Sequence, residues 1–186
     1  PVGQSNFRAQ VSRTGLTPTQ VKAADAVWWS IYSTVSVGTG TNTVNNFFND
    51  VPTTLAGGNV NSGILPAPQS MIVKEISFLA AGVASVGITV PDYAALQTAV
   101  LSITVADKLF HQVPLGKLGI SGICKGTTDT SATSVNLKPP AYELPIPIVI
   151  PSQSKFSATL TTGAVATSGS VVTVLVLSGE MNRLVV

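Results

Sequence analysis

The chain has 186 residues and a formal net charge of +2, and only 10% of its residues are charged while 45% are hydrophobic. This length suits one domain with a complete core, and the scarcity of charge predicts a surface of small, weakly polar residues that offers large contact patches. The small net charge gives no argument for nucleic-acid binding, and Pro, Gly, Ser and Thr interrupt every apolar run short of the ~18 residues that a membrane-spanning helix needs.

The N-terminal part of the sequence predicts an arm that leads into a short helix. Residues 1–16 are rich in Gln, Ser, Asn and Gly and contain few large apolar groups. The stretch 17–20 (Thr-Pro-Thr-Gln) offers a Thr N-cap, Pro at the first helical position and Gln three residues after the cap, which predicts a helix that ends near Ala26. We therefore divide the chain into an N-terminal arm with a short helix, residues 1–26, and a single folded domain, residues 27–186.

The predicted arm is mildly basic. Arg8, Arg13 and Lys22 all precede the first acidic residue, Asp25. Either a solvated tail or a few weak, salt-sensitive contacts with phosphate groups would account for this charge. The sequence begins at Pro1 without the basic-then-apolar layout of a signal peptide, which we interpret as loss of an initiator Met and synthesis inside the cell.

Alternating and β-branched segments follow one another through the rest of the chain, separated by loops rich in Gly and Pro. We expect eight or nine strands, together with a short helix at 91–97 that starts with Pro and Asp. Two of the runs flank a turn at 107–108 and predict a hairpin. These strands should come from eleven segments with strand character, of which some are short or rich in proline: 27–35, 44–48, 70–80, 83–90, 100–105, 108–113, 120–124, 134–137, 146–150, 154–162 and 171–177.

Four of these segments carry specific expectations about their position. The segment 70–80 contains only two charges and should be central in its sheet. Prolines at 145, 147 and 151 limit the segment 146–150 to an edge strand or an extended piece of chain. The strict alternation of 154–162 should bury its three apolar residues on one face. The continuous β-branched run 171–177 should be covered on both faces.

Many strands, long Gly/Pro loops and no alternation of strand with helix predict an all-β, antiparallel β-sandwich. Our preferred version is a jelly roll of about eight strands with one or two short helices and an extended N-terminal arm. The long connection 38–69, dense in Gly, Asn, Thr and Pro, should be functional or lie against a neighbouring molecule.

The residues that catalysis or metal binding would need are few. His111 is the only histidine, and strand alternation would place it on one face with Leu109 and Val113, so we interpret it as an ordinary, partly buried histidine. The single cysteine, Cys124, excludes an internal disulfide and should behave as a small buried hydrophobe. The acidic residues follow no metal-binding pattern, although calcium bound by loop carbonyls stays open. We expect no enzymatic activity, no cofactor and no metal site.

The adjacent pair Trp28 and Trp29 allows two interpretations. Neighbouring residues of a strand point to opposite faces, so one indole should enter the core while the other faces a neighbouring molecule or a covering loop. Alternatively, an exposed indole could form the platform of a carbohydrate-binding site. We favour the first interpretation.

The whole layout resembles the single jelly-roll capsid proteins of icosahedral, prokaryotic viruses. The resemblance rests on a mobile, mildly basic arm, a short helix and a Ser/Thr/Ala/Val-rich sandwich with long loops. Two stretches carry it: the loop and strand at 65–76 (LPAPQSMIVKEI) and the final strand with its polar exit at 174–183 (VLVLSGEMNR). The arm departs from the pattern, because many such proteins of RNA viruses have long Arg-rich arms and this one has two Arg.

The resemblance implies a structural protein of the virion, assembled in the host cytoplasm, that forms an icosahedral shell through loop, arm and sandwich-edge contacts. Its partners would be copies of itself and other capsid proteins, together with an internal membrane face or a weak genome contact through the arm, and no small-molecule substrate. A virion decoration or fibre protein and a carbohydrate-binding sandwich that uses Trp28 or Trp29 remain as alternatives. The candidate interaction residues are Arg8, Arg13, Lys22, Trp28, Trp29 and Arg183.

Overall fold

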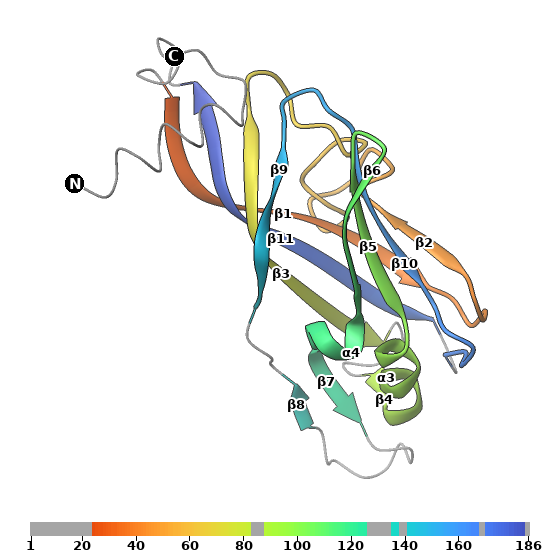
Figure 1. The fold of residues 1–186 in the computed structure, drawn as a ribbon. Coiled ribbons are helices and arrows are strands. Elements are labelled where there is room, and N and C mark those ends of the chain that lie inside the picture. Colours follow the sequence, from red (N-terminus) through yellow and green to blue (C-terminus); the bar gives the residue numbers. More distant parts are fainter. Residues whose placement is uncertain (1–23, 83–87, 126–134, 138–140, 168–169, 185–186) are drawn as a thin grey trace.

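The structure of the protein is a computed structural model that describes residues 24–82, 88–125, 135–137, 141–167 and 170–184. It consists mostly of strands arranged in two sheets that pack face to face as a sandwich (Figure 1). The expectation of a β-sandwich is therefore confirmed. Within the described residues there are also two short helices, α3 (Val90–Gln97) and α4 (Leu115–Leu118), which contact each other at one end of the sandwich.

The larger sheet has seven strands and the smaller has four. In the larger sheet the order is β1 (Ala24–Val37), β11 (Val171–Leu184), β3 (Ser70–Gly82), β7 (Ser121–Lys125) and β4 (Ile88–Thr89), with β9 (Tyr142–Ile150) beside β3 and β8 (Val135–Leu137) beside β7. In the smaller sheet the order is β2 (Val44–Phe47), β10 (Phe156–Thr161), β5 (Val100–Val105) and β6 (Lys108–Pro114).

Four antiparallel pairs are nested within one another along the chain. The strand β1 pairs with β11 over its full length, β2 pairs with β10, β3 pairs with β9, and β5 pairs with β6. The chain therefore folds like a long hairpin whose two halves run side by side, with β4, β7 and β8 added outside this pattern. As expected, β3 is central and β9 lies at an edge, because β9 pairs with β3 alone.

Two details of the fold differ from the sequence-based expectation. The sandwich is not wholly antiparallel, since β7 runs parallel to both β3 and β4. The predicted helix cannot reach Ala26, because residues 24–26 begin β1 and pair with the end of β11. Backbone pairing with a distant strand outweighs the local helix preference there. The rest of the predicted arm and helix lies outside the described residues.

The core fills the space between the two sheets. The alternation of β10 is confirmed, since Phe156, Ala158 and Leu160 are fully buried while the residues between them are not. The rings of Phe47 and Phe78 meet edge to face across the two sheets, with 6.2 Å between their centroids. Such a pair contributes about 0.5–1.5 kcal/mol beyond its buried area.

The expectation for β11 is wrong in one respect. Its odd-numbered residues Val171, Thr173, Leu175 and Leu177 are fully buried, but the valines between them are only half-buried. These valines lie on the outer face of the larger sheet. A β-branched run predicts an apolar environment on both faces, and within a single copy only the inner face has one.

Candidate interaction surface

The two tryptophans lie on opposite faces of β1, as strand alternation predicts. Trp28 is 54% exposed and shares the outer face with its cross-strand partner Glu180, whereas Trp29 is 47% exposed and shares the inner face with the buried Ile31. The expectation that one indole enters the core is therefore wrong. Both rings are half exposed.

Trp29 remains exposed because the two sheets differ in extent. The strand β1 has 14 residues, but β2, which contacts it from the smaller sheet, has only four. The first half of β1 and the last residues of β11 extend together beyond the smaller sheet (Figure 1). Inward-facing side chains in this overhang, Val27 and Trp29 among them, therefore have no opposing sheet among the described strands.

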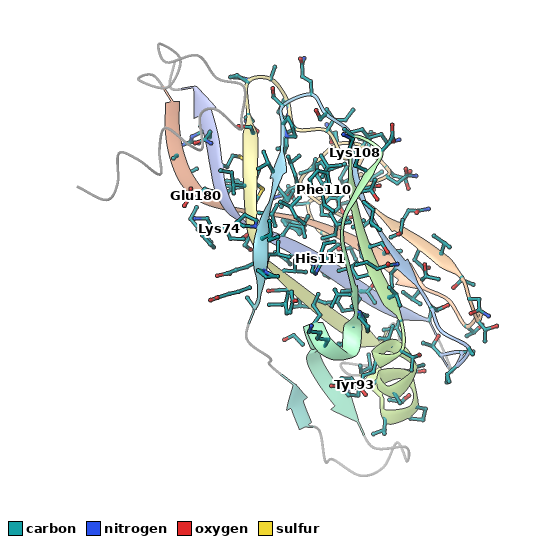
Figure 2. The ribbon with its side chains drawn as sticks, in the orientation of Figure 1. Lys74, Tyr93, Lys108, Phe110, His111 and Glu180 are labelled. Atoms are coloured by element: carbon teal, nitrogen blue, oxygen red, sulfur yellow. The ribbon has the colours of Figure 1, made fainter. Side chains whose placement is uncertain are left out.

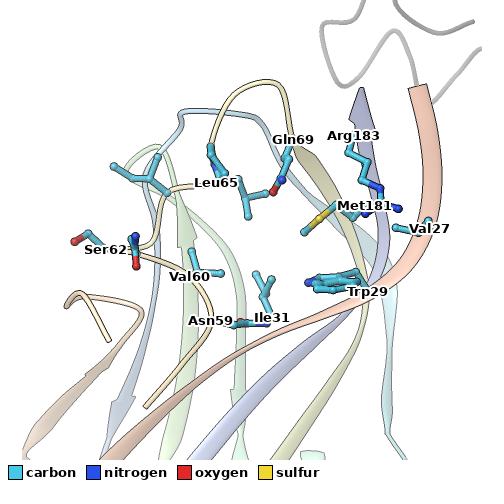
Figure 3. A pocket seen from close by; sticks show the side chains of 13 residues that line it. Val27, Trp29, Ile31, Asn59, Val60, Ser62, Leu65, Gln69, Met181 and Arg183 are labelled. Carbon is cyan, nitrogen blue, oxygen red and sulfur yellow. The ribbon is translucent and has the colours of Figure 1, made fainter. Parts of the chain in front are cut away.

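A cavity of about 670 Å³ lies under this overhang. Its walls come from β1, from the loop that follows β2 and from the end of β11, and the side chains of Trp29, Ile31 and Met181 face the same hollow (Figure 3). The lining combines apolar side chains with amide, hydroxyl and guanidinium groups. The lining residues are Val27, Trp29, Ile31, Asn59, Val60, Asn61, Ser62, Ile64, Leu65, Pro66, Gln69, Met181 and Arg183.

The loop between β2 and β3 binds part of the edge of β1 that faces away from β11. The backbone N–H of Tyr32 donates to Asn59 Oδ1 (2.8 Å), the Asn59 Nδ2 donates to the carbonyl of Ser30 (2.9 Å), and the backbone N–H of Asn59 donates to the carbonyl of Tyr32 (3.2 Å). Two residues further along β1, the N–H of Thr34 donates to the carbonyl of Gly57 (2.9 Å). We expected the connection 38–69 to be functional or to lie against a neighbouring molecule. Part of it has a role within its own subunit, because it caps the edge of its own sheet.

Arg183, a candidate interaction residue from the sequence, belongs to the last strand. It is exposed near the end of β11, opposite Asp25 in the register of β1, and it borders the cavity. The remaining basic candidates, Arg8, Arg13 and Lys22, lie outside the described residues. The structure therefore brings Trp29 and Arg183 together and places Trp28 on the opposite face.

An ion pair lies on the outer face close to Trp28. Lys74 of β3 donates to Glu180 Oε1 of β11, and both side chains are about one-third exposed, at 36% and 27% (Figure 2). A pair this exposed contributes little to stability, about 0–1 kcal/mol. Its value is to neutralise two of the few charges on this face.

His111 occupies a partly buried position on β6 (Figure 2). Its Nε2 is buried and has no hydrogen-bond partner among the described residues, and its ring lies 5.8 Å from that of Tyr142, centroid to centroid. Burial, and to a smaller extent the positive charge of Lys117, lower the pKa of His111 below its ordinary value. A poorly solvated ring that packs against an aromatic neighbour fits the structural role that we expected.

The neighbours of His111 are not those that alternation predicts. A β-bulge shifts the register of β6 against β5, so His111 is opposite Ile103 while Leu109 is opposite Thr104. Leu109 therefore leaves the face that His111 and Val113 share, and it is exposed, as is Phe110. Cys124 belongs to β7, and its side chain is outside the described part of the chain.

Sequence reasoning missed most of the cavity. Asn59 and Gln69 come from the loop between β2 and β3, Trp29 comes from β1 and Met181 from β11, and only strand pairing brings these three segments together. The one available signal was the Gly-Gly-Asn stretch at 57–59, which marked a turn but not its position on β1.

Two general findings concern the described residues alone. No three His, Cys, Asp or Glu side chains among them are grouped closely enough to hold a metal ion. Neither α3 nor α4 is long and apolar enough to cross a membrane. A comparison of the sequence with protein-family models found no match, and a comparison with curated proteins found none either.

Proposed function

We propose that this protein is a structural subunit of an icosahedral viral shell, built on a jelly roll, and that its function is self-assembly. The observation that carries the proposal is the nested pairing of β1 with β11, β2 with β10, β3 with β9, and β5 with β6. A jelly roll consists of eight strands wrapped in this manner, with the first strand beside the last and the fourth beside the fifth. Viral capsid proteins are among the proteins built on it.

The order of the strands supports the same interpretation. When β4, β7 and β8 are treated as additions, the eight remaining strands have the order first, eighth, third, sixth in one sheet and second, seventh, fourth, fifth in the other. This order is what results when a long antiparallel ribbon is wrapped around a core. The fold alone does not decide the function, because lectins and cupins share it.

Exposed apolar groups favour a shell subunit over a solitary domain. Leu55 is 80% exposed and Ile146 is 77% exposed, and they lie in different regions of the surface along with half-exposed Trp28 and Val165. The chain has few charges to keep such a surface soluble. Contacts with several neighbours would cover these groups, and the sum of many weak contacts would stabilise a large assembly.

The partners in this proposal are copies of the same chain and other capsid proteins in the virion. The arm, with Arg8, Arg13 and Lys22, would make at most two or three phosphate contacts, which would give weak genome binding that falls as salt rises. An internal membrane face is the other surface that the inward side of a shell built from such weakly charged subunits would suit.

Electron microscopy and sedimentation velocity of the purified full chain test the proposal. We expect closed particles or rings of five or six subunits, with an apparent mass that increases with protein concentration. A monodisperse monomer that persists up to about 1 mM would contradict self-assembly, since shell contacts of the ordinary size of roughly 1,200–2,000 Å² associate well below that concentration.

One observation favours a second function, the binding of a saccharide in the cavity. The indole of Trp29 borders the cavity together with the amides of Asn61 and Gln69. A sugar ring can stack its apolar face on an indole while its hydroxyls bond to amides, and binding sites are usually hollows of about 300–1,000 Å³ that combine both kinds of group.

The chain offers an internal control for this second function, because it has only two tryptophans and they lie on opposite faces. Intrinsic fluorescence should saturate during titration with neutral malto-, cello- or chito-oligosaccharides, and Trp29→Ala should abolish the response while Trp28→Ala keeps it. No response to any of these sugars at about 10 mM, or equal loss in both variants, would exclude the cavity as their binding site.

A further inference from the structure

The first half of β1 is a sheet edge that no described strand pairs with on the side away from β11. Tyr32 exchanges both of its backbone hydrogen bonds with Asn59, so its backbone groups point away from β11. Along a strand, backbone groups alternate between the two sides, and the pairing of β1 with β11 has no register shift. The N–H and C=O of Ala24, Ala26 and Trp28 must therefore also point away from β11, where no described residue pairs with them.

The other described edges carry features that discourage pairing. The strand β9 has prolines at 145 and 147, which remove backbone donors, and β6 contains the bulge at Phe110. The strands β2, β4 and β8 are short, with four, two and three residues. The segment 24–29 of β1 has regular geometry, contains neither a proline nor a bulge, and is paired on its second side by no described strand. It is the described edge best suited to receive another strand.

The two tryptophans flank this edge on both faces. Trp28 lies on the outer face and Trp29 on the inner face, and each leaves about half of its surface exposed. A strand added beside residues 24–29 would cover part of both indoles at once. Its inward side chains would also enter the mouth of the cavity that Val27 and Trp29 line. The adjacent tryptophans would then both take part in association. Packing in the core explains neither indole, and the cavity involves only Trp29.

We propose that the segment 24–28 of β1 pairs antiparallel with the same segment of a second copy, so that the larger sheets of two subunits form one continuous sheet. This inference rests on the proposed self-assembly and assigns one of its contacts. A two-fold axis at Ala26 would place Ala26 opposite its own copy and Ala24 opposite Trp28 of the partner. About six backbone hydrogen bonds would form. The small Ala24 of each copy would then lie opposite Trp28 of the other, which makes the edge complementary to itself.

Chemical cross-linking tests the position of the axis. In a Cys124→Ser background, Ala26→Cys leaves one thiol per chain, so a short bismaleimide can link two chains only at position 26. We expect a covalent dimer as the main product. The matched control is Ser36→Cys, since Ser36 is also exposed and has the same orientation on β1 but lies outside the proposed seam. It should give several-fold less dimer.

A charge exchange tests the pairing without a cross-linker. Ala26→Lys and Ala26→Glu each place like charges opposite one another, so each variant alone should associate about twofold to fivefold more weakly, and an equimolar mixture should recover the lost association. Ser36→Lys should leave the association unchanged.

The outcomes separate this inference from the proposed function. If the unsubstituted chain assembles but position 26 cross-links no better than position 36, and the charge variants behave like the unsubstituted chain, the β1 seam is wrong and self-assembly stands. If the unsubstituted chain stays monomeric at every concentration, both proposals fail. Cross-linking at position 26 together with recovery in the mixture would establish the seam.

Discussion

The cap on the edge of β1 can be tested by replacing Asn59 with Ala. This change removes two hydrogen bonds, the one that the side chain accepts from Tyr32 N–H at 2.8 Å and the one that it donates to the carbonyl of Ser30 at 2.9 Å. A typical hydrogen bond contributes about 0.5–1.5 kcal/mol net. Both bonds are exposed, so water replaces part of each, and we expect a loss of about 1–2 kcal/mol in the free energy of unfolding.

Thermal unfolding followed by circular dichroism measures this loss. For a domain of this size, 1 kcal/mol corresponds to about 2–4 °C in Tm, so Asn59→Ala should lower Tm by about 2–8 °C. The control is Asn61→Ala in the same loop, where the exposed side chain can be shortened at a cost within about 0.5 kcal/mol. Equal Tm values for the two variants would show that Asn59 does not hold the loop on β1.

Three further changes test other parts of the structure by equilibrium unfolding. Gly63→Ala should cost about 2–4 kcal/mol, because Gly63 has a φ of 62° and an added Cβ would meet backbone carbonyls, whereas Gly38→Ala has nothing within 4 Å and should be nearly neutral. Ser70→Ala should raise stability by about 1 kcal/mol, since the buried Ser70 Oγ has no hydrogen-bond partner among the described residues, and a loss of stability would reveal a partner. Burial first, and the charge of Lys117 second, lower the pKa of His111, so the imidazole of the unfolded chain binds a proton at a higher pH than that of the folded chain. The free energy of unfolding should therefore fall as pH drops below about 6.5, and His111→Phe should make that decline shallower. An unchanged slope in the variant would show that His111 does not cause the decline.

The strands could be predicted because period-two alternation is a local property of the sequence. The segments 100–105 and 154–162 alternate cleanly, and their apolar residues are buried as expected. The start of β1 could not be predicted, because the capping pattern before Ala26 is also local and favours a helix. Its strand conformation depends on β11, which is about 150 residues away in the chain, and no local signal contains that pairing.

The site was less predictable than the fold for a related reason. Alternation correctly placed Trp28 and Trp29 on opposite faces, but whether an inward side chain is covered depends on the extent of the opposite sheet. The bulge at Phe110 changed the neighbours of His111 in the same way, since no glycine marked it in the sequence. Which face a side chain occupies follows from its own strand, and its burial follows from other strands.

The magnitudes indicate how much this edge of β1 could contribute to assembly. An indole buries about 150–250 Å², so even complete covering of the exposed halves of Trp28 and Trp29 would remove only about 200 Å² per copy. At about 25 cal/mol per Å² this sets an upper limit of roughly 5 kcal/mol per copy, or roughly 10 kcal/mol for a two-fold pair. Association itself costs about 4–15 kcal/mol. The β1 seam alone would therefore hold two copies weakly, and a stable shell would also need the apolar groups around Leu55 and Ile146. Weak individual contacts of this kind allow subunits to dissociate and correct their positions before a closed shell fixes them.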